Sequence, residues 1–273
     1  MEYIDKNKSR EKAHRLIKYF LDRVKEECET YPDDLYAAFR GDKESKDKFV
    51  SLLLEDSGHH CCYCMASIDG TTLEHVILNS IKSQEEFNRY FEMESELDRN
   101  NIILAKNFLE KPSDVPPFPH TISYENLIPS CFGHLPLSSG SSKCCNNYRG
   151  ENFVYPLVFR KNINSEIIYY SDGRIEWLAD PEDVTPTITK LGLDCAELKA
   201  IRRIWCFLSS KNLSCDDKNR ELTINCLIDE LDDSKKEKNM MNMLLNFKNK
   251  EYWKLLEKYQ YFNDYSKFKA TNK

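Results

Sequence analysis

The chain has 273 residues, a formal net charge of −6 and 41% hydrophobic residues, which suits one large domain or a smaller core with an attached helical region. The start, from Met1 to Lys6, is charged, and no stretch approaches the roughly 20 apolar residues of a membrane span, so we expect a cytoplasmic protein without a secretory signal or a membrane partner. In that compartment the eleven cysteines are expected to be reduced thiols, some of them metal ligands, and not a disulfide framework.

Residues 1–58 are predicted to form an N-terminal helical region. Apolar side chains recur at helical spacing from Leu16 to Val24 and again from Phe49 to Leu53, and Gly58 follows shortly before the first cysteines. We therefore expect helices that bury one face each before the motif-bearing part of the chain begins.

Residues 59–178 carry most of the motifs and are expected to contain short strands. Strand-like runs occur at Phe153–Phe159 and Glu166–Tyr170, and a turn at Ser171–Arg174 leads into Ile175–Leu178. Together with the flanking helical regions, these runs favour the α+β class, with a small β-hairpin extension.

A helical insertion is expected at about 79–120, inside this middle region. Within it, Gln84–Arg99 is acidic but apolar along one side, and Lys111–Pro119 contains four prolines and should be irregular or extended. The insertion is either a solvated helical segment or a docking surface or lid near the functional site.

The C-terminal region, residues 179–273, is predicted to be helical again. Asp194–Glu197 has the spacing of a capping box, and further helices are expected at about 219–231 and about 236–258. From residue 235 onward, ten lysines against four acidic residues give a local charge of +6, which leaves −12 for the rest of the chain. This basic tail is either a solvated helix face or a contact for nucleic acid or an acidic partner.

Two groups of cysteines have the spacing of a tetrahedral zinc site, a C-x-x-C knuckle and a later pair. The four expected ligands are Cys61, Cys64, Cys131 and Cys145. Either Cys62 or Cys144 could replace its neighbour, and His134 is a further alternative. The zinc would be structural, because it would hold a small sheet and a helix together where little apolar surface is buried.

Between the two cysteine groups lies a carboxylate beside a histidine, Glu74 and His75. Phosphodiester hydrolysis needs a base to activate water and a cation to hold the phosphate, and a neutral imidazole suits the base. Carboxylate and amide oxygens suit Mg²⁺, and Asn126 and Asn146 follow further along the chain. Neighbouring strand residues face opposite ways, so Glu74 and His75 can serve one site only near a strand end or bend.

With these motifs the chain resembles the HNH nucleases, whose core is a zinc-bound treble-clef or ββα-metal fold. The matching motifs are C-x-Y-C at Cys61–Cys64, Glu74-His75, Asn126-Leu127, and C-N-x-x-R-G at Cys145–Gly150. It is most similar to the branch formed by the HNH subunits of Septu anti-phage systems, through Tyr155–Leu157, Ser171–Gly173, Leu191–Asp194, Leu198 and Arg202. Two departures are Leu78, where family members usually have proline, and the long insertion after His75.

The resemblance implies a role for each residue of the candidate site. His75 would be the general base, and Asn126 would brace the loop and the base. Glu74 and Asn146 would bind the catalytic Mg²⁺ or Mn²⁺, with Asn147 as the alternative to Asn146.

The implied function is metal-dependent hydrolysis of phosphodiester bonds in antiviral defence, together with an ATPase of the ABC or SMC type. Lys143 and Arg149 are the expected contacts to nucleic acid. DNA is the favoured substrate and RNA, such as tRNA, the alternative, because the chemistry acts on the phosphate. The competing function is a zinc-stabilised module that binds nucleic acid or protein without catalysis, and the presence of His75 with both oxygen ligands favours the enzyme.

Overall fold

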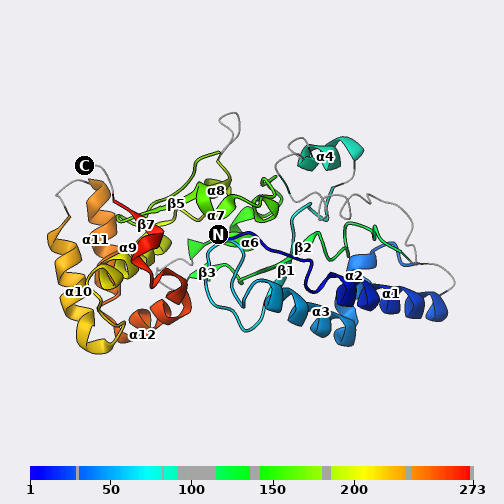
Figure 1. Cartoon of the computed structure of the whole chain (residues 1–273), viewed down its shortest axis with the longest axis horizontal. Coiled ribbons are helices and arrows are strands. Elements are labelled where there is room, and N and C mark those ends of the chain that lie inside the picture. Colours follow the sequence, from blue (N-terminus) through cyan, green and yellow to red (C-terminus); the bar gives the residue numbers. More distant parts are fainter. Residues whose placement is uncertain are drawn as a thin grey trace. The chain divides into compact units, whose positions relative to one another are not determined.

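The structure, a computed structural model, describes residues 1–28, 31–81, 83–91, 97, 115–135, 142–179, 186–231 and 235–270. The chain is of the α+β class and forms two compact units (Figure 1). The first unit comprises Met1–Cys62, Asp69–Ser130 and Glu151–Asn164, and the second comprises Tyr63–Ile68, Cys131–Gly150 and Ser165–Lys273. This division differs from the three consecutive regions expected from the sequence, because the chain leaves the first unit and returns to it twice. Within the ranges given above, no helix is long and apolar enough to cross a bilayer.

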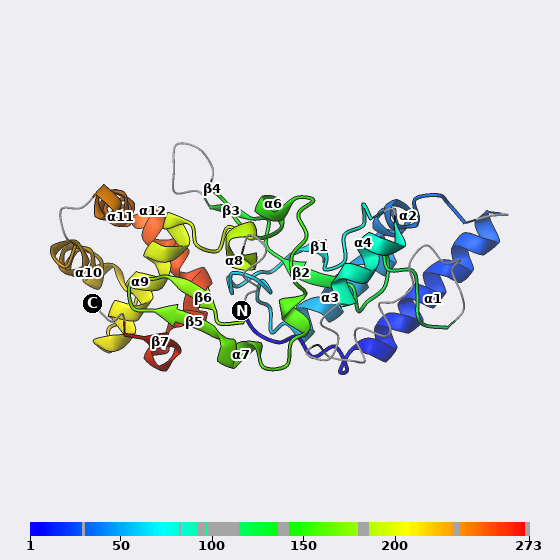
Figure 2. The same ribbon diagram turned by 90° about the horizontal axis from the view of Figure 1, so that it is seen from above.

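The first unit begins with three helices that pack together, α1 (Arg10–Glu27), α2 (Leu35–Gly41) and α3 (Lys43–Asp56) (Figure 2). Each turns one apolar face inward, as predicted. In their core, edge-to-face ring contacts with centroids 5.2 Å apart run from Phe20 to Phe39, from Phe39 to Phe49 and from Phe49 to Tyr124. The last of these rings ties the helical core to the segment just before Asn126.

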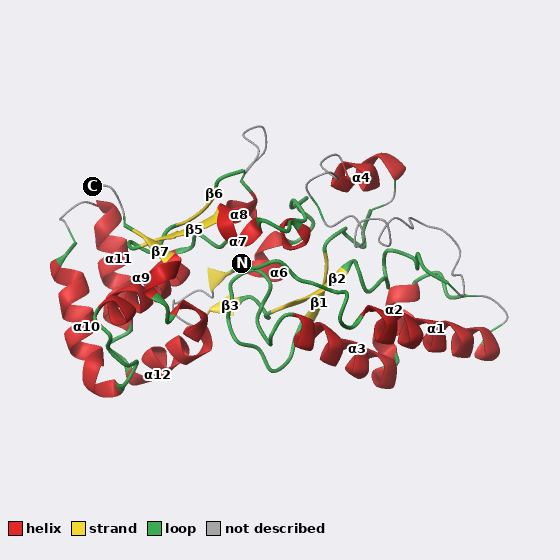
Figure 3. Cartoon of the chain, viewed as in Figure 1, coloured by secondary structure: helices red, strands yellow, loops and turns green. Residues whose placement is uncertain are grey.

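The other elements of the first unit are β1 (Thr72–His75), α4 (Gln84–Asn88), η1 (Arg89–Phe91), β2 (Leu127–Ser130) and η3 (Leu157–Phe159). The strands β1 and β2 pair antiparallel (Figure 3). Glu74 lies opposite Ile128 and His75 opposite Leu127. The pairing therefore brings the Glu-His motif beside the segment that begins at Asn126.

The acidic helix predicted at Gln84–Arg99 is present only in its first part. The Ser83 hydroxyl accepts a hydrogen bond from the Glu86 amide and so caps α4, which passes into the 3-10 turn η1. Apart from Leu97, which forms a bridge with Arg160, the rest of this prediction lies outside the described residues. So does the beginning of the proline-rich segment predicted at Lys111–Pro119.

The run Phe153–Phe159, predicted as a strand, is not one. Pro156 has no amide hydrogen to give to a neighbouring strand, and the chain closes instead into the 3-10 helix η3. There the Phe159 amide donates to the Pro156 oxygen at 3.0 Å.

The second unit contains two small sheets. Their strands are β3 (His134–Leu135), β4 (Ser142–Lys143), β5 (Ile167–Tyr170), β6 (Ile175–Trp177) and β7 (Phe268–Lys269). The helix α6 (Cys145–Arg149) follows β4, and α7 (Ile163–Glu166), in which the chain passes from the first unit to the second, leads into β5. The larger sheet has the order β6-β5-β7, with β5 antiparallel to β6 and parallel to β7. The hairpin predicted from the Ser171–Arg174 turn is confirmed.

Helices make up most of the remainder of the second unit. They are α8 (Thr187–Lys190), α9 (Ala196–Ser210), α10 (Asp217–Asp229), α11 (Lys235–Asn246), α12 (Lys250–Trp253), η4 (Lys254–Phe262) and η5 (Tyr265–Lys267). The helix expected at about 219–231 is α10. The single helix expected at about 236–258 is instead broken after Asn246, and Asn249 caps the next one by accepting from the Glu251 amide at 2.8 Å.

The capping box predicted at Asp194–Glu197 is wrong. Helix α9 begins one residue later than the motif requires, with Cys195 at the N-cap position, and the Asp194 carboxylate pairs with Lys199 at 2.8 Å. An ion pair with the first turn therefore replaces the expected bond to the backbone.

A fully buried arginine on α9 joins two motifs that lie beyond the cysteines. Arg202 donates to the backbone oxygens of Gly173 at 2.6 Å and Leu193 at 2.9 Å. Gly173 has a φ of 87°, and a Cβ atom there would lie 2.1 Å from the Lys199 oxygen, so only glycine fits. The Ser171–Gly173 and Leu191–Asp194 motifs thus have a structural explanation within the second unit.

Candidate functional site

The pairing of β1 with β2 places Glu74 and His75 at the end of a strand. β1 ends at His75, and the next amide, that of Val76, donates to the Asn126 oxygen at 2.9 Å. Glu74 and His75 are both buried, with exposed fractions of 5% and 8%. The strand-end position that two neighbouring residues need in order to serve one site is therefore present.

His75 is oriented by two contacts within the first unit. Its Nε2 atom lies 2.8 Å from the backbone oxygen of Thr121, and its ring packs edge-on against Tyr36 with centroids 4.4 Å apart. A carbonyl oxygen can only accept a hydrogen bond, so Nε2 carries the hydrogen and Nδ1 has the lone pair that can take up a proton. The contact with Thr121 thus decides which ring nitrogen can act as the base, and that nitrogen is Nδ1.

Tyr36, on α2, is a site residue that the sequence analysis missed. Its hydroxyl donates to the backbone oxygen of Leu73 at 3.3 Å, which links α2 to β1. Burial raises the pKa of Tyr36; Arg40 acts in the opposite direction and Glu74 in the same one, and the phenol stays neutral near pH 7. No motif relates residue 36 to His75, so only the folded contact reveals it.

Asn126 holds together the two segments that follow β1 and precede β2. Its Oδ1 accepts from the Ile77 amide at 2.6 Å, and its Nδ2 donates to the oxygens of Ile77 at 2.9 Å and His120 at 2.7 Å. The side chain is fully buried. Asn126 therefore positions the backbone on either side of His75 and does not itself face a substrate, which is the geometry of a bracing residue.

Glu125, the residue before Asn126, is the centre of a buried charged network that the sequence analysis did not identify. Its carboxylate accepts from Arg10 at 3.1 Å, from the His14 ring at 2.8 Å and from the Ser123 hydroxyl at 2.9 Å. Burial alone would raise the pKa of Glu125, but the hydrogen bonds from His14 and Ser123 hold it below its usual value. The network fastens α1 to the segment that carries Asn126.

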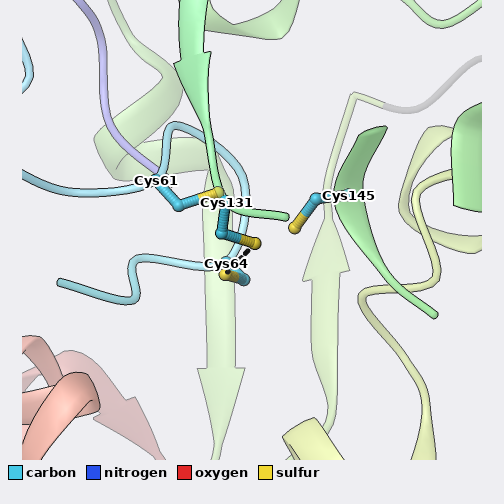
Figure 4. A group of neighbouring side chains, drawn as sticks. All are labelled: Cys61, Cys64, Cys131 and Cys145. Carbon is cyan, nitrogen blue, oxygen red and sulfur yellow. Dashed lines mark hydrogen bonds between the residues drawn. The ribbon is translucent and has the colours of Figure 1, made fainter. Parts of the chain in front are cut away.

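Four cysteines bring their sulfur atoms together in a group that could hold a metal ion (Figure 4). They are Cys61, Cys64, Cys131 and Cys145, and all four Sγ atoms lie within 4.8 Å of one another. A tetrahedral zinc ion with bonds of about 2.3 Å requires sulfur atoms roughly 3.8 Å apart. The Sγ atoms of Cys64 and Cys131 are separated by 3.8 Å, so the set fits zinc in both donor type and spacing.

The alternative ligands considered from the sequence are not part of this group. Cys62 and Cys144 are buried beside it, and Cys144 Sγ lies 3.6 Å from Cys145 Sγ. The Nε2 atom of His134 lies 2.9 Å from the Asn147 side-chain nitrogen. The four-cysteine set predicted from the spacing is the one that the structure assembles.

Local backbone geometry aims the last of these sulfur atoms. Cys145 has a φ of 54°, in the left-handed region that costs a side-chain-bearing residue about 1–2 kcal/mol. Its amide donates to the Leu191 oxygen at 2.7 Å, and the Cys144 amide donates to the Gly133 oxygen at 2.9 Å. These two bonds hold the strained conformation, which is explained if a metal ion binds the thiolate.

Tyr259 is a buried neighbour of the cysteines that the sequence did not indicate. Burial raises the pKa of Tyr259 well above its usual value, and the negative charges of Cys64, Cys144 and other cysteines raise it further. The Lys258 oxygen accepts from the Ser67 amide at 2.6 Å, which joins η4 to the first cysteine knuckle. The phenol of Tyr259 therefore stays protonated beside the cysteines at neutral pH.

The residues expected on α6 have different surroundings. Asn146 is half-buried and Lys143, just before the helix, is exposed. The Asn147 side-chain nitrogen donates to the Phe132 oxygen. Arg149 is fully buried, and a buried guanidinium offers no surface to a phosphate, so Arg149 does not fit its predicted role as a nucleic-acid contact.

A scan of the chain against protein-family models and searches of curated proteins and of solved structures found no significant match.

Proposed function

We propose that the chain is a metal-dependent endonuclease of the HNH type, stabilised by a structural zinc ion. The observation that carries the proposal is the 2.8 Å contact from His75 Nε2 to the Thr121 oxygen, because it makes Nδ1 the ring nitrogen that can act as a base, in the residue that follows Glu74. The bracing contacts of Asn126 and the four-cysteine group support the same class. Each is an arrangement that the motifs of the resemblance would require.

In the proposed reaction, His75 Nδ1 takes a proton from a water molecule whose oxygen attacks the phosphorus of a phosphodiester. The bond from phosphorus to the leaving oxygen breaks, and that oxygen takes up a proton from solvent. The Thr121 oxygen stabilises the imidazolium that forms, because it still accepts from Nε2.

A carboxylate oxygen of Glu74 is a suitable ligand for Mg²⁺ or Mn²⁺, and such an ion would neutralise charge on the phosphate. The second protein ligand remains Asn146, with Asn147 as its alternative. The Asn147 side-chain nitrogen donates to the Phe132 oxygen, but an amide binds Mg²⁺ through its oxygen. This hydrogen bond therefore does not exclude Asn147 as the alternative ligand.

The biological setting is proposed from the resemblance alone. DNA is the favoured substrate, RNA such as tRNA is the alternative, and the expected partner is an ATPase of the ABC or SMC type in the cytoplasm during defence against phage. A zinc-stabilised binding module is the competing function. Such a module would need the cysteines but would not need a base at His75 Nδ1.

The test is incubation of the purified chain, alone and with such an ATPase, with plasmid DNA and with total RNA. Mg²⁺, Mn²⁺ and EDTA are compared. Cleavage by the wild type should require the divalent ion, and His75→Ala should lower the rate by roughly 10²–10⁴ with unchanged zinc content. His59→Asn is the matched control, because His59 is exposed with a φ of 59°, a conformation that asparagine tolerates.

Binding of nucleic acid without cleavage under every condition would select the binding module. Full cleavage by folded His75→Ala would contradict the mechanism, and cleavage of RNA alone would reverse the preference for DNA.

A further inference from the structure

An exposed arginine on α2, outside every motif of the sequence, shares an aromatic neighbour, Tyr36, with His75. Arg40 is four residues after Tyr36, so both side chains are on one face of the helix. The Arg40 Cζ atom is 5.7 Å from the centre of the Tyr36 ring, within the range of a cation–π contact. Tyr36 in turn packs on His75 with ring centroids 4.4 Å apart.

The three side chains form one continuous group in the first unit. The Arg40 Cζ atom and the His75 ring are both measured from the centre of the Tyr36 ring. The distance from Arg40 Cζ to the centre of the His75 ring therefore cannot exceed the sum of those two distances. The Tyr36 hydroxyl is fixed on β1 through Leu73, so the ring that supports the guanidinium is anchored to the strand that carries the candidate site.

Among the residues that the structure describes, none forms an ion pair or a hydrogen bond with Arg40, whereas Arg23 on α1 pairs with Asp42. Arg40 is exposed, so its guanidinium keeps its donors available while one of its faces rests on the Tyr36 ring. A planar guanidinium with free donors is the group that binds phosphate oxygens in pairs.

We propose that Arg40 binds a backbone phosphate of the nucleic-acid substrate next to the bond that His75 cleaves, with Tyr36 as its support. This inference rests on the proposed function and adds to it a contact from an N-terminal helix that lies outside the motifs of the resemblance, which run from Cys61 to Arg202. Arg40 would hold the substrate against the site, and Tyr36 would keep the distance between the bound phosphate and the base constant.

The test measures binding separately from cleavage. Full-length, zinc-containing His75→Ala protein is titrated with short fluorescein-labelled DNA and RNA oligonucleotides over a range of salt concentrations, and Arg40→Ala, Arg40→Lys and Arg15→Ala are added to this background. Arg15, an exposed arginine on α1, is the matched control. Cleavage by the same three variants is measured with His75 intact.

Arg40→Ala should weaken binding by at least about tenfold, as expected for the loss of a charged hydrogen-bonding group. The salt slope, which is the slope of log affinity against log salt concentration, should become smaller by about one, because one phosphate contact is lost. Arg40→Lys should restore the salt slope but only part of the affinity, since an ammonium group cannot donate two parallel hydrogen bonds to one phosphate as a guanidinium does. Arg15→Ala should match its parent. For cleavage, kcat/KM should fall with Arg40→Ala by a factor similar to the loss of affinity.

Unchanged affinity and salt slope in Arg40→Ala would overturn the proposal for Arg40. If the wild type cleaves nothing but binding still depends on Arg40, the phosphate contact stands and the nuclease function fails. If cleavage depends on His75 but neither binding nor cleavage depends on Arg40, the nuclease function stands and the phosphate contact of Arg40 fails.

Discussion

The ammonium group of Lys6 lies 4.5 Å from the centre of the Tyr124 ring and donates to the backbone oxygen of the same residue. A second donated bond reaches the Leu127 oxygen. Lys6 is fully buried, so it fixes both ends of the four-residue segment that contains Glu125 and Asn126. A charged residue from the start of the chain thus helps to shape the candidate site.

The first prediction concerns the pH dependence that Lys6 gives to stability. Burial lowers the pKa of Lys6 to about 7 from 10.5, so between these values the unfolded chain binds more protons than the folded one. The free energy of unfolding should therefore gain up to about 1.4 kcal/mol per pH unit from Lys6 as the pH rises through this window. Lys6→Met removes this gain. Denaturant unfolding at pH 7 and pH 9 measures it.

In that experiment, the difference in unfolding free energy between the wild type and Lys6→Met should grow with pH. Lys8→Met, which changes an exposed lysine, should parallel the wild type. A difference that stays constant between pH 7 and pH 9 would show that Lys6 titrates normally.

The second prediction concerns Glu125. Glu125→Gln leaves Arg10 and His14 without a carboxylate, and the unfolding free energy at pH 7 should fall by about 2–4 kcal/mol. The folded-state pKa of Glu125 is lowered, so its contribution is present above the usual value of 4.5 and is lost as the pH falls below it. Wild type and variant should therefore converge in acid, whereas Glu55→Gln, at an exposed position, should have little effect at any pH. Equal stabilities at pH 7 would refute the network.

The third prediction concerns the metal. Elemental analysis should give about one zinc per chain, and Cys64→Ser or Cys145→Ser should lose the zinc and become insoluble, because the thiolates and the ion contribute directly to folding. Cys62→Ser, beside the group but not in it, should keep the zinc, as should the exposed Cys28→Ser. Loss of zinc from Cys62→Ser together with its retention in Cys64→Ser would show that Cys62, and not Cys64, is the ligand.

The fourth prediction concerns Asn126. Asn126→Asp keeps the acceptor for the Ile77 amide but turns a carboxylate oxygen toward two backbone oxygens. The unfolding free energy should fall by about 2–4 kcal/mol, and cleavage should decline because the backbone around His75 is no longer held. Hydrogen exchange at the Ile77 amide measures the loosening directly. Wild-type protection of that amide in the variant would argue against the bracing role.

The cysteine ligands could be predicted because thiolate chemistry restricts both residue type and spacing, and the structure assembles the expected four. For Glu74 and His75 the sequence indicated only that they must lie near a strand end or bend, and their pairing with Leu127–Ser130 was not predicted. Tyr36, Thr121 and Glu125 could not be predicted, because each acts through a contact between segments far apart in the sequence. A backbone oxygen such as that of Thr121 also has no signature in the amino-acid letters.

Errors at individual elements have local causes. The run that contains Pro156 is apolar and aromatic like a strand, but the missing amide hydrogen excludes it from a ladder. At the start of α9, the spacing of Asp194 suggested a cap, yet the nearby lysine competes for the same carboxylate. Burial of Arg149 depends on tertiary packing, which a motif does not encode.

The sulfur atoms of Cys64 and Cys131 are neighbours although 67 positions separate them in the chain. The entropy of closing such a loop varies only with the logarithm of its length, by roughly 0.6 kcal/mol per doubling. Insertions of very different size can therefore be added to this loop at little thermodynamic cost to the metal centre, provided that β1, β2 and the segment from His120 to Asn126 stay in place. For evolution, and equally for engineering, this stretch is a natural place to acquire a sensor or a tethering domain.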